Sequence, residues 1–228
     1  MRTIGLLGGM SWESTALYYQ LLNEAAAARL GGLHSAPIVL HSVDFAPIEQ
    51  MQVAGRWDEA GSILADAAQG LVSAGAELVA LATNTMHKVS APIEAAIEVP
   101  FVHLIDATAT ALTHDGLSRV GLLATGFTME DGFYAERMRQ HGIDVLVPDP
   151  DDRAEVHRVI YEELCLGSIK DSSRDRYLDV ARRFENSGAQ GLVLGCTEIE
   201  LLLRPGDTTL RQYPTTAIHV DAILDAAA

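Results

Sequence analysis

SAGAELVALATNT, residues Ser73–Thr85, recurs about half the chain later as NSGAQGLVLGCTE, residues Asn186–Glu198. The two stretches share a glycine–alanine pair and an apolar run that leads to a hydroxyl or thiol side chain, Thr83 in the first and Cys196 in the second. A second pair of stretches, TIGLLGG and RVGLLATG, repeats at nearly the same spacing, starting at positions 3 and 119. The sequence therefore predicts two copies of one structural unit.

The size and composition of the chain fit two globular units. With 228 residues, of which 48% are hydrophobic, each half can bury a core of its own, and disorder is excluded. No apolar run approaches the roughly 20 residues that cross a bilayer, and the start of the chain has no signal-peptide pattern. We expect a cytoplasmic protein that does not interact with membranes.

The charge and the cysteines exclude several further classes of function. The 31 acidic residues outnumber the 16 basic ones, so the surface repels phosphate backbones, and nucleic acid is not an expected partner. Two cysteines, Cys165 and Cys196, do not have the spacing of a metal-ligand set or of a disulfide framework. We expect no metal site, and either thiol could take part in chemistry.

Short β-branched runs alternate with Ala- and Leu-rich stretches, which predicts an α/β protein with parallel sheets flanked by helices. The expected strands cover 3–7, 36–42, 78–82, 100–104, 120–123, 144–147 and 191–194, and the main expected helices cover 18–29, 59–73, 129–141, 153–166 and 173–187. A short helix at 221–228 is expected to pack back on the first half. This gives one domain of residues 1–105 with 214–228, and a second domain of residues 106–213.

Polar runs follow three of the expected strands. In open parallel sheets, ligands bind beyond the carboxyl ends of the strands, where backbone N–H groups and helix N-termini favour an anion. The runs begin at Gly8, Thr83 and Cys196, and they offer the amide and hydroxyl groups of Asn84, Thr85 and Thr197 to a carboxylate. A thiol at a helix N-terminus is expected to have a lowered pKa, which would make Cys196 a thiolate able to abstract a proton.

Five runs together carry a family resemblance: GLLGGMSWEST, SVDFAPIEQMQ, TNTMHK, YEELCLGS and GCTEI. Over essentially the whole chain, the sequence resembles the aspartate/glutamate racemase family, in particular its amino-acid racemase branch. The resemblance implies a racemase that needs no pyridoxal phosphate or other cofactor, with two pseudo-symmetric α/β domains, an active site at the domain interface and a homodimeric assembly. Typical members use two cysteines, one on each face of the substrate α-carbon.

The catalytic pair is carried over with one departure. Cys196 matches the second family cysteine, whereas Thr83 stands where the first is found. In two-base chemistry one group removes the α-proton and the other, already protonated, delivers a proton to the opposite face. By analogy with glutamate racemases, Cys196 is expected to remove the α-proton of the L-enantiomer. Thr83 is expected to deliver a proton to the opposite face, directly or through water. Conversion from L to D should therefore be favoured in initial rate.

The resemblance also implies the substrate, an acidic amino acid. Aspartate racemases commonly have an arginine in the segment that matches Asp44–Gln52 and a lysine in the one that matches Tyr161–Gly167, and this chain has neither. Gln52 is the expected substitute at a distal carboxylate, and the backbone N–H of Met10 is expected to contact the substrate. The expected reaction is the racemisation of L-aspartate or L-glutamate.

Two other functions stay open at this point. One is a single-cysteine enzyme of the same superfamily that resembles arylmalonate decarboxylase, and the other is a non-catalytic protein that binds acidic amino acids. Four further side chains are given structural roles: Cys165 is expected in the core, His87 and Lys88 are expected to face solvent or carboxylates, and Glu198 is expected to cap a helix.

Overall fold

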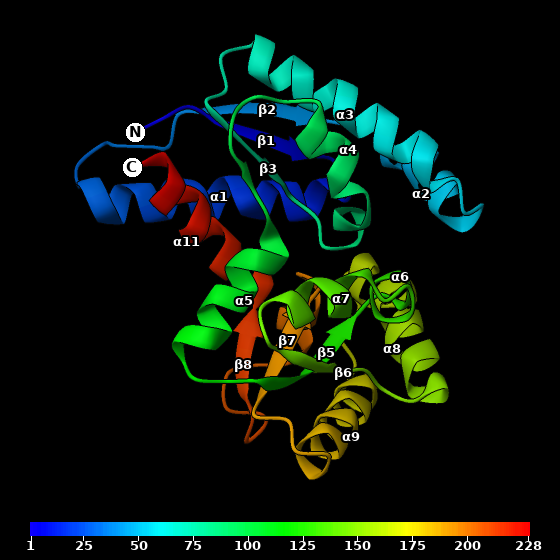
Figure 1. The fold of residues 1–228 in the computed structure, drawn as a ribbon. Helices are drawn as coiled ribbons and strands as arrows, with labels where there is room; N and C mark the ends of the chain where they lie inside the picture. The colour runs from blue at the N-terminus through cyan, green and yellow to red at the C-terminus, as the bar shows by residue number, and fades with distance from the viewer. The chain divides into compact units, whose positions relative to one another are not determined.

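The computed structural model describes residues 1–228, and its chain contacts divide it into two compact units. Unit 1 comprises Met1–Leu104 and His219–Ala228, and unit 2 comprises Ile105–Ile218. Each unit is built around one four-stranded parallel sheet with helices on its faces (Figure 1). The predicted α/β fold with two similar parallel sheets is confirmed.

The sheet of unit 1 has the strand order β2-β1-β3-β4. Its strands are β1 (Ile4–Gly8), β2 (Ile38–Ser42), β3 (Leu78–Leu81) and β4 (Phe101–Val102). All neighbouring strands are parallel, and Ile4 of β1 pairs with Leu78 of β3. Every residue of β1 and β3 is buried, as expected for central strands of a parallel sheet that is covered on both faces.

Two hydrophobic clusters cover the two faces of this sheet. The helices of unit 1 are α1 (Trp12–Leu30), α2 (Phe45–Val53), α3 (Trp57–Ser73), the 3-10 helix η1 (Thr85–Val89), α4 (Ser90–Ala95) and the last part of α11 (Thr215–Ala227). On one face, α2, α3 and α4 pack against Leu7, Val79 and Leu81. On the other face, α1 and α11 pack against Ile4 and Leu6, so residues from the end of α11 complete the core of unit 1 (Figure 1).

Unit 2 repeats the same arrangement with the strand order β6-β5-β7-β8. Its strands are β5 (Arg119–Ala124), β6 (Asp144–Leu146), β7 (Gly191–Gly195) and β8 (Arg211–Pro214). Its helices are α5 (Leu104–His114), α6 (Gly126–Glu130), α7 (Phe133–Gln140), α8 (Pro150–Glu162), η2 (Leu164–Leu166), α9 (Asp171–Asn186) and α10 (Ile199–Leu202). All its strand pairs are parallel.

The internal repeat of the sequence corresponds to matching places in the two sheets. The glycine-rich runs form the central strands β1 and β5, and the runs that end at Thr83 and Cys196 form their neighbours β3 and β7. Gly75 and Gly188, just before β3 and β7, have φ values of 99° and 83°. These left-handed conformations explain why both copies have glycine at the helix end.

Several elements differ from those predicted: helices α4 (Ser90–Ala95), α5 and α10 were not expected, and α11 begins at Thr215 instead of residue 221. Residues Phe45–Val53, for which no helix was predicted, form α2, whose N-terminus is capped by Asp44 through a hydrogen bond of 3.3 Å from the Ala46 N–H. The expected helix 129–141 is broken into α6 and α7, because Gly132 adopts a left-handed conformation with φ 75°. The short edge strand β8 is too polar and too short to stand out as a strand from its sequence.

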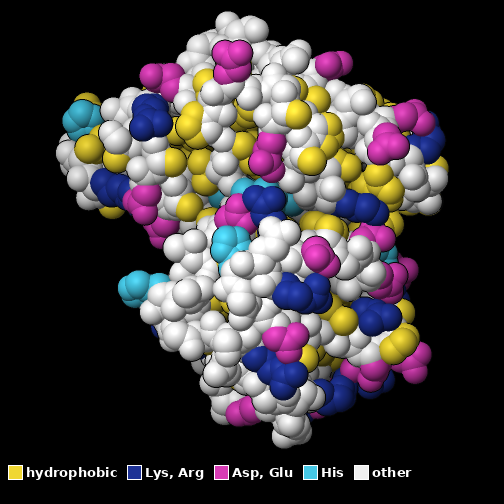
Figure 2. Space-filling model, in the orientation of Figure 1, with side chains coloured by type: hydrophobic (Ala, Val, Ile, Leu, Met, Phe, Trp, Pro, Cys, Tyr) yellow, Lys and Arg dark blue, Asp and Glu magenta, His cyan; other side chains and the backbone are white.

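Surface charges of opposite sign are interspersed on the face that Figure 2 shows. Within unit 1, Arg29 pairs with Asp221 and Asp225, and within unit 2, Arg119 pairs with Asp144 across the β5–β6 edge. None of the helices combines the length and the apolar character that a membrane crossing requires.

The close approach at Gly121 of β5 generates a prediction about stability. A Cβ atom at this position would lie 2.4 Å from the ring of Phe184, whereas a Cβ at Gly70, in α3, would lie 3.8 Å from its nearest neighbour. We expect Gly121→Ala to lower the free energy of unfolding by about 2 kcal/mol through overpacking. Gly70→Ala should raise it by about 0.5–1 kcal/mol, because alanine is the better helix former. Urea unfolding of both variants checks this, and equal effects of the two changes would contradict it.

Candidate active site

The half-site of unit 1 lies at the carboxyl ends of two adjacent strands. Thr83 follows β3 and is half-buried, and Asn84 and Thr85 continue into η1 with only 8% of each residue exposed. Met10 follows β1, the neighbour of β3 in the sheet, and is 6% exposed. Strand order therefore brings Met10 and the Thr83–Thr85 turn to the same edge of the sheet.

The turn after β1 is held by the first turn of α1. Ser11 is the N-cap and accepts a hydrogen bond of 3.2 Å from the Ser14 N–H. The Thr15 hydroxyl accepts from the Gly9 N–H at 2.8 Å and donates to the Ser11 carbonyl at 2.8 Å. A Cβ at Gly8 would lie 2.4 Å from the Thr15 side chain, so the close packing of this turn requires glycine.

Gln52, the expected contact for a distal carboxylate, lies in α2 and is 4% exposed. Its Nε2 atom donates to the Met86 Sδ atom at 2.9 Å, which joins α2 to the η1 turn. Its Oε1 atom is buried without a hydrogen-bond partner. A buried amide oxygen without a hydrogen-bond partner costs free energy.

His87 does not face solvent as expected. His87 is 3% exposed, and its ring nitrogens bond the Thr83 carbonyl at 2.7 Å and the Leu104 N–H at 3.2 Å. The Lys88 ammonium is half-buried and lies over the Trp57 ring, 3.8 Å from its centroid, which is a cation–π contact. In η1 the His87 side chain points inward, a feature that hydrophobic periodicity does not reveal.

The half-site of unit 2 contains Cys196, Thr197 and Glu198 after β7. The Cys196 thiol donates to Glu198 Oε2 at 2.9 Å, and the Thr197 hydroxyl donates to the same oxygen at 2.6 Å. Glu198 makes no side-chain cap bond to α10, so the expected capping role is wrong. It instead accepts the hydrogen bond of the Cys196 thiol, a contact that sequence reasoning missed.

The environment of Cys196 also corrects the expected thiolate. Burial, and after it the negative charge of Glu198, raise the pKa of the Cys196 thiol well above its usual value. The expectation of a pKa near neutrality was wrong because α10 spans only Ile199–Leu202, and a carboxylate lies directly at the sulfur. At rest Cys196 is therefore a thiol that is hydrogen-bonded to a base.

Cys165 was expected in the core, and the structure shows it exposed in η2. The buried residues of this segment are Leu164 and Glu163. The Glu163 carboxylate accepts from the Ser173 hydroxyl at 2.6 Å and pairs with Arg158 and Lys170 at 2.9 and 3.2 Å. The YEELCLGS run is thus anchored by a buried charge. Cys165 was predicted in the core because the apolar periodicity of the sequence continues beyond Glu162, where α8 ends.

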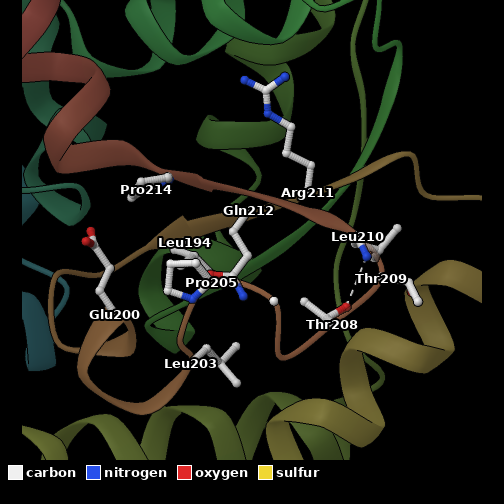
Figure 3. Close-up of a pocket in the computed structure, with 11 residues that line it drawn as sticks. Leu194, Glu200, Leu203, Pro205, Thr208, Thr209, Leu210, Arg211, Gln212 and Pro214 are labelled. Atoms are coloured by element: carbon white, nitrogen blue, oxygen red, sulfur yellow. Dashed lines mark hydrogen bonds between the residues drawn. The ribbon is translucent and has the colours of Figure 1, made fainter.

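A second acidic residue, Glu200, lies in a pocket beside β7 and β8. The pocket has a volume of about 440 Å³, and its walls include Leu194, Leu203, Pro205, Gln212 and Pro214 (Figure 3). Burial, and after it Glu198, raise the pKa of Glu200 to about 7. None of the residues predicted for the site lines this pocket.

No group of three or more His, Cys, Asp or Glu side chains is arranged to hold a metal ion. The side chains at the two strand-end half-sites are thiol, hydroxyl, amide and carboxyl groups. These groups can bind a carboxylate and transfer protons.

Comparisons with known proteins now identify the family. A family model described as Asp/Glu/Hydantoin racemase matches residues 7–223. The chain belongs to this racemase family. A crystal structure of a putative Asp/Glu racemase from Yersinia pestis has 51% sequence identity and a TM-score of 0.95, and the match covers 100% of this chain and 99% of that one. An aspartate racemase homologue from Pyrococcus horikoshii OT3 has 32% identity and a TM-score of 0.88, with 100% and 99% covered.

A third relative is the broad specificity amino-acid racemase RacX of Bacillus subtilis strain 168, which is 24% identical over 64% of this chain and 64% of its own length. Membership of the Asp/Glu/hydantoin racemase family makes this chain an isomerase and supports the racemisation of amino acids. The family resemblance and the two-sheet fold expected from the sequence are confirmed.

The Cys196–Glu198 contact generates a prediction about thiol reactivity. Because the carboxylate disfavours the thiolate, we expect Glu198→Gln to shift the titration midpoint of Cys196 to lower pH. The midpoint is measured from the rate of alkylation by iodoacetamide against pH, in a Cys165→Ser background that removes the exposed thiol. Glu185→Gln, at an exposed position in α9, is the matched control. An unchanged or higher midpoint in Glu198→Gln would show that the carboxylate does not control this thiol.

Proposed function

We propose that this family member is a cofactor-independent racemase of L-aspartate or L-glutamate, in which Cys196 and Thr83 act on opposite faces of the α-carbon. The observation that carries the proposal is the Cys196 thiol, which is hydrogen-bonded to Glu198 at the strand end that matches Thr83 in the other sheet. Two proton-transfer groups at equivalent strand ends of a repeated unit are what a two-face proton exchange needs.

The proton path starts from the resting thiol. Glu198 Oε2, at 2.9 Å from the sulfur, accepts the thiol proton, and the resulting thiolate removes the α-proton of the L-amino acid and becomes a thiol again. The Thr83 hydroxyl then donates its proton to the opposite face of the carbanion, and water returns a proton to the Thr83 oxygen. Glu198 gives up its proton to solvent, so no net proton is gained or lost.

The carbanion needs stabilisation at the substrate carboxylate, where its charge spreads. Asn84, Thr85, Thr197 and the Met10 N–H are the donors that we assign to this task, and all belong to the strand-end turns. Hydrogen bonds to this oxyanion grow stronger as charge develops, so they lower the barrier more than they strengthen substrate binding.

We assign the distal carboxylate of the substrate to Gln52. A carboxylate requires an N–H donor, and the Gln52 Nε2 atom carries two N–H groups: one donates to the Met86 Sδ atom at 2.9 Å, and we assign the other to the carboxylate. An amide gives a weaker contact than the guanidinium of an arginine. The preference for acidic over neutral side chains should therefore be modest.

Three further properties complete the proposal. The substrate is a free amino acid, the active enzyme is a homodimer, and the protein acts in the cytoplasm. The chain has a formal net charge of −15, so its surface repels phosphate groups. This charge argues against nucleic acid as a partner.

Thr83 makes the two directions kinetically unequal. The free enantiomers have equal free energies in water, so kcat/KM must be the same for both directions. A hydroxyl is a weak base, and we therefore expect kcat for L to D to exceed kcat for D to L by about tenfold or more, with KM larger by the same factor. Chiral chromatography of reactions started from each enantiomer of aspartate and glutamate at saturation measures this. Equal kcat values in both directions would contradict the role of Thr83.

The role of Cys196 has its own test. Cys196→Ala should abolish the exchange of the α-hydrogen of L-aspartate with heavy water, followed by proton NMR, because the remaining base at that strand end, the Glu198 carboxylate, is a much weaker base than a thiolate. Cys165→Ala, which removes the exposed thiol of η2, is the matched control and should retain exchange. If exchange persists in Cys196→Ala, Cys196 is not part of the mechanism. If exchange is lost in Cys165→Ala, the assignment of the catalytic thiol to Cys196 is wrong.

A further inference from the structure

His87 touches the backbone of Thr83 from inside unit 1. Its Nδ1 atom lies 2.7 Å from the Thr83 carbonyl oxygen, and its Nε2 atom lies 3.2 Å from the backbone nitrogen of Leu104. The Leu104 N–H can only donate, so Nε2 must accept, and Nδ1 therefore carries the proton and donates to Thr83. These two bonds require the neutral ring with its proton on Nδ1, since a protonated ring has no acceptor for Leu104.

The carbonyl of Thr83 depends on this donor. β3 ends at Leu81, so Thr83 lies beyond the sheet ladder that would pair its carbonyl with another strand. The 3-10 turn that follows, closed by a bond of 3.1 Å from the His87 N–H to the Asn84 carbonyl, brings the imidazole back to the strand end. A histidine four residues after Thr83 can therefore serve as its backbone donor.

The ring is held by a layer of buried aromatic side chains. His103, Phe101 and His219 lie 4.6, 5.9 and 6.0 Å from His87 between ring centroids. His219 is itself fixed, because Nε2 donates to the Val102 carbonyl at 2.8 Å and Nδ1 accepts from the Tyr18 hydroxyl at 2.9 Å. Burial lowers the pKa of His219 to about 4, so the His219 ring is uncharged around neutral pH.

We propose that His87 is a positioning residue for Thr83: its Nδ1–H fixes the Thr83 carbonyl and thereby the direction in which the Thr83 hydroxyl points. The inference rests on the proposed racemase function. The Thr83 carbonyl belongs to the peptide plane between Thr83 and Asn84, so a rotation of this plane would misalign both the proton donor and the first residue of the carboxylate-binding turn. Displacements of about 1 Å at a reacting group can lower a rate by about 100-fold.

Two substitutions separate the two hydrogen bonds of the ring. The amide of asparagine reaches the position of Nδ1, so His87→Asn can keep the donor to Thr83 while it loses the acceptor for Leu104. The amide of glutamine reaches the position of Nε2, so His87→Gln can accept from Leu104 while it leaves the Thr83 carbonyl without a donor. Each variant removes one buried hydrogen bond, so the two should melt at similar temperatures.

The expected result is a difference in kcat. With L-aspartate as substrate, kcat of His87→Gln should fall by about 30-fold or more, kcat of His87→Asn should stay within about threefold of the unchanged protein, and KM should stay within about threefold in both. A purely structural role would make activity follow melting temperature, with similar losses in the two variants. Similar losses, or an unchanged kcat in His87→Gln, would overturn the inference.

Deuterium labelling adds a readout for the face on which Thr83 acts. In heavy water, a misaligned Thr83 should leave the carbanion to take up a deuteron from the Cys196 side, which gives back L-aspartate. The ratio of D-aspartate formed to α-deuterium in recovered L-aspartate should therefore fall at least fivefold in His87→Gln. An unchanged ratio would oppose the inference. If the unchanged protein neither racemises nor exchanges aspartate or glutamate, the proposed function fails instead.

The tautomer can be read without any variant. Long-range proton–nitrogen NMR of the full chain, with His87 assigned, should show a neutral ring with its proton on Nδ1 at pH 7. A proton on Nε2 would mean that the ring cannot donate to Thr83, and this would overturn the inference even if both variants failed to fold.

Discussion

Hydrogen bonding between fully buried parallel strands is the constraint on which the rest of the structure depends. β1 and β3 in one unit and β5 and β7 in the other have helices on the faces of their sheets, so their side chains are almost entirely apolar. Polar chemistry is confined to the residue that follows each strand, where the ladder ends and backbone groups become available. This is why Thr83 and Cys196 stand at matching places, and why each needs a local partner.

Those partners differ in kind between the two units. Cys196 is held through its side chain by a carboxylate, and Thr83 is held through its backbone by an imidazole. A carboxylate at the sulfur keeps the thiol protonated and so makes the thiolate harder to form. The same carboxylate is the base that can accept the thiol proton. A backbone contact leaves the Thr83 hydroxyl chemically unchanged and acts only on its direction. The asymmetry of the two residues thus extends to their surroundings.

The sequence was sufficient for the architecture because the repeat fixes which strands are equivalent, and because the apolar runs are continuous. It failed where a side chain decides a local structure. The break at Gly132 and the edge strand β8 gave no periodic signal, and the α2 signal at Asp44 was overlooked although Asp is a good N-cap.

The site was predicted unevenly for the same reason. Met10 and Thr83–Thr85 lie where strand order requires, but the inward turn of His87 and the Cys196–Glu198 bond depend on three-dimensional geometry within short turns. The opposition of Thr83 and Cys196 across a substrate, and the domain boundaries drawn from composition, stay predictions.

The return of α11 to unit 1 has a consequence for biosynthesis. Val220, Ile223, Leu224 and Ala227 pack with Ile4, Tyr18 and Leu22, although all of unit 2 separates these two groups along the chain. On the ribosome, residues 105–218 are therefore synthesised, and can fold, before the end of α11 packs on the N-terminal part of unit 1. Until then, that nascent segment presents an uncovered apolar face that chaperones can shield.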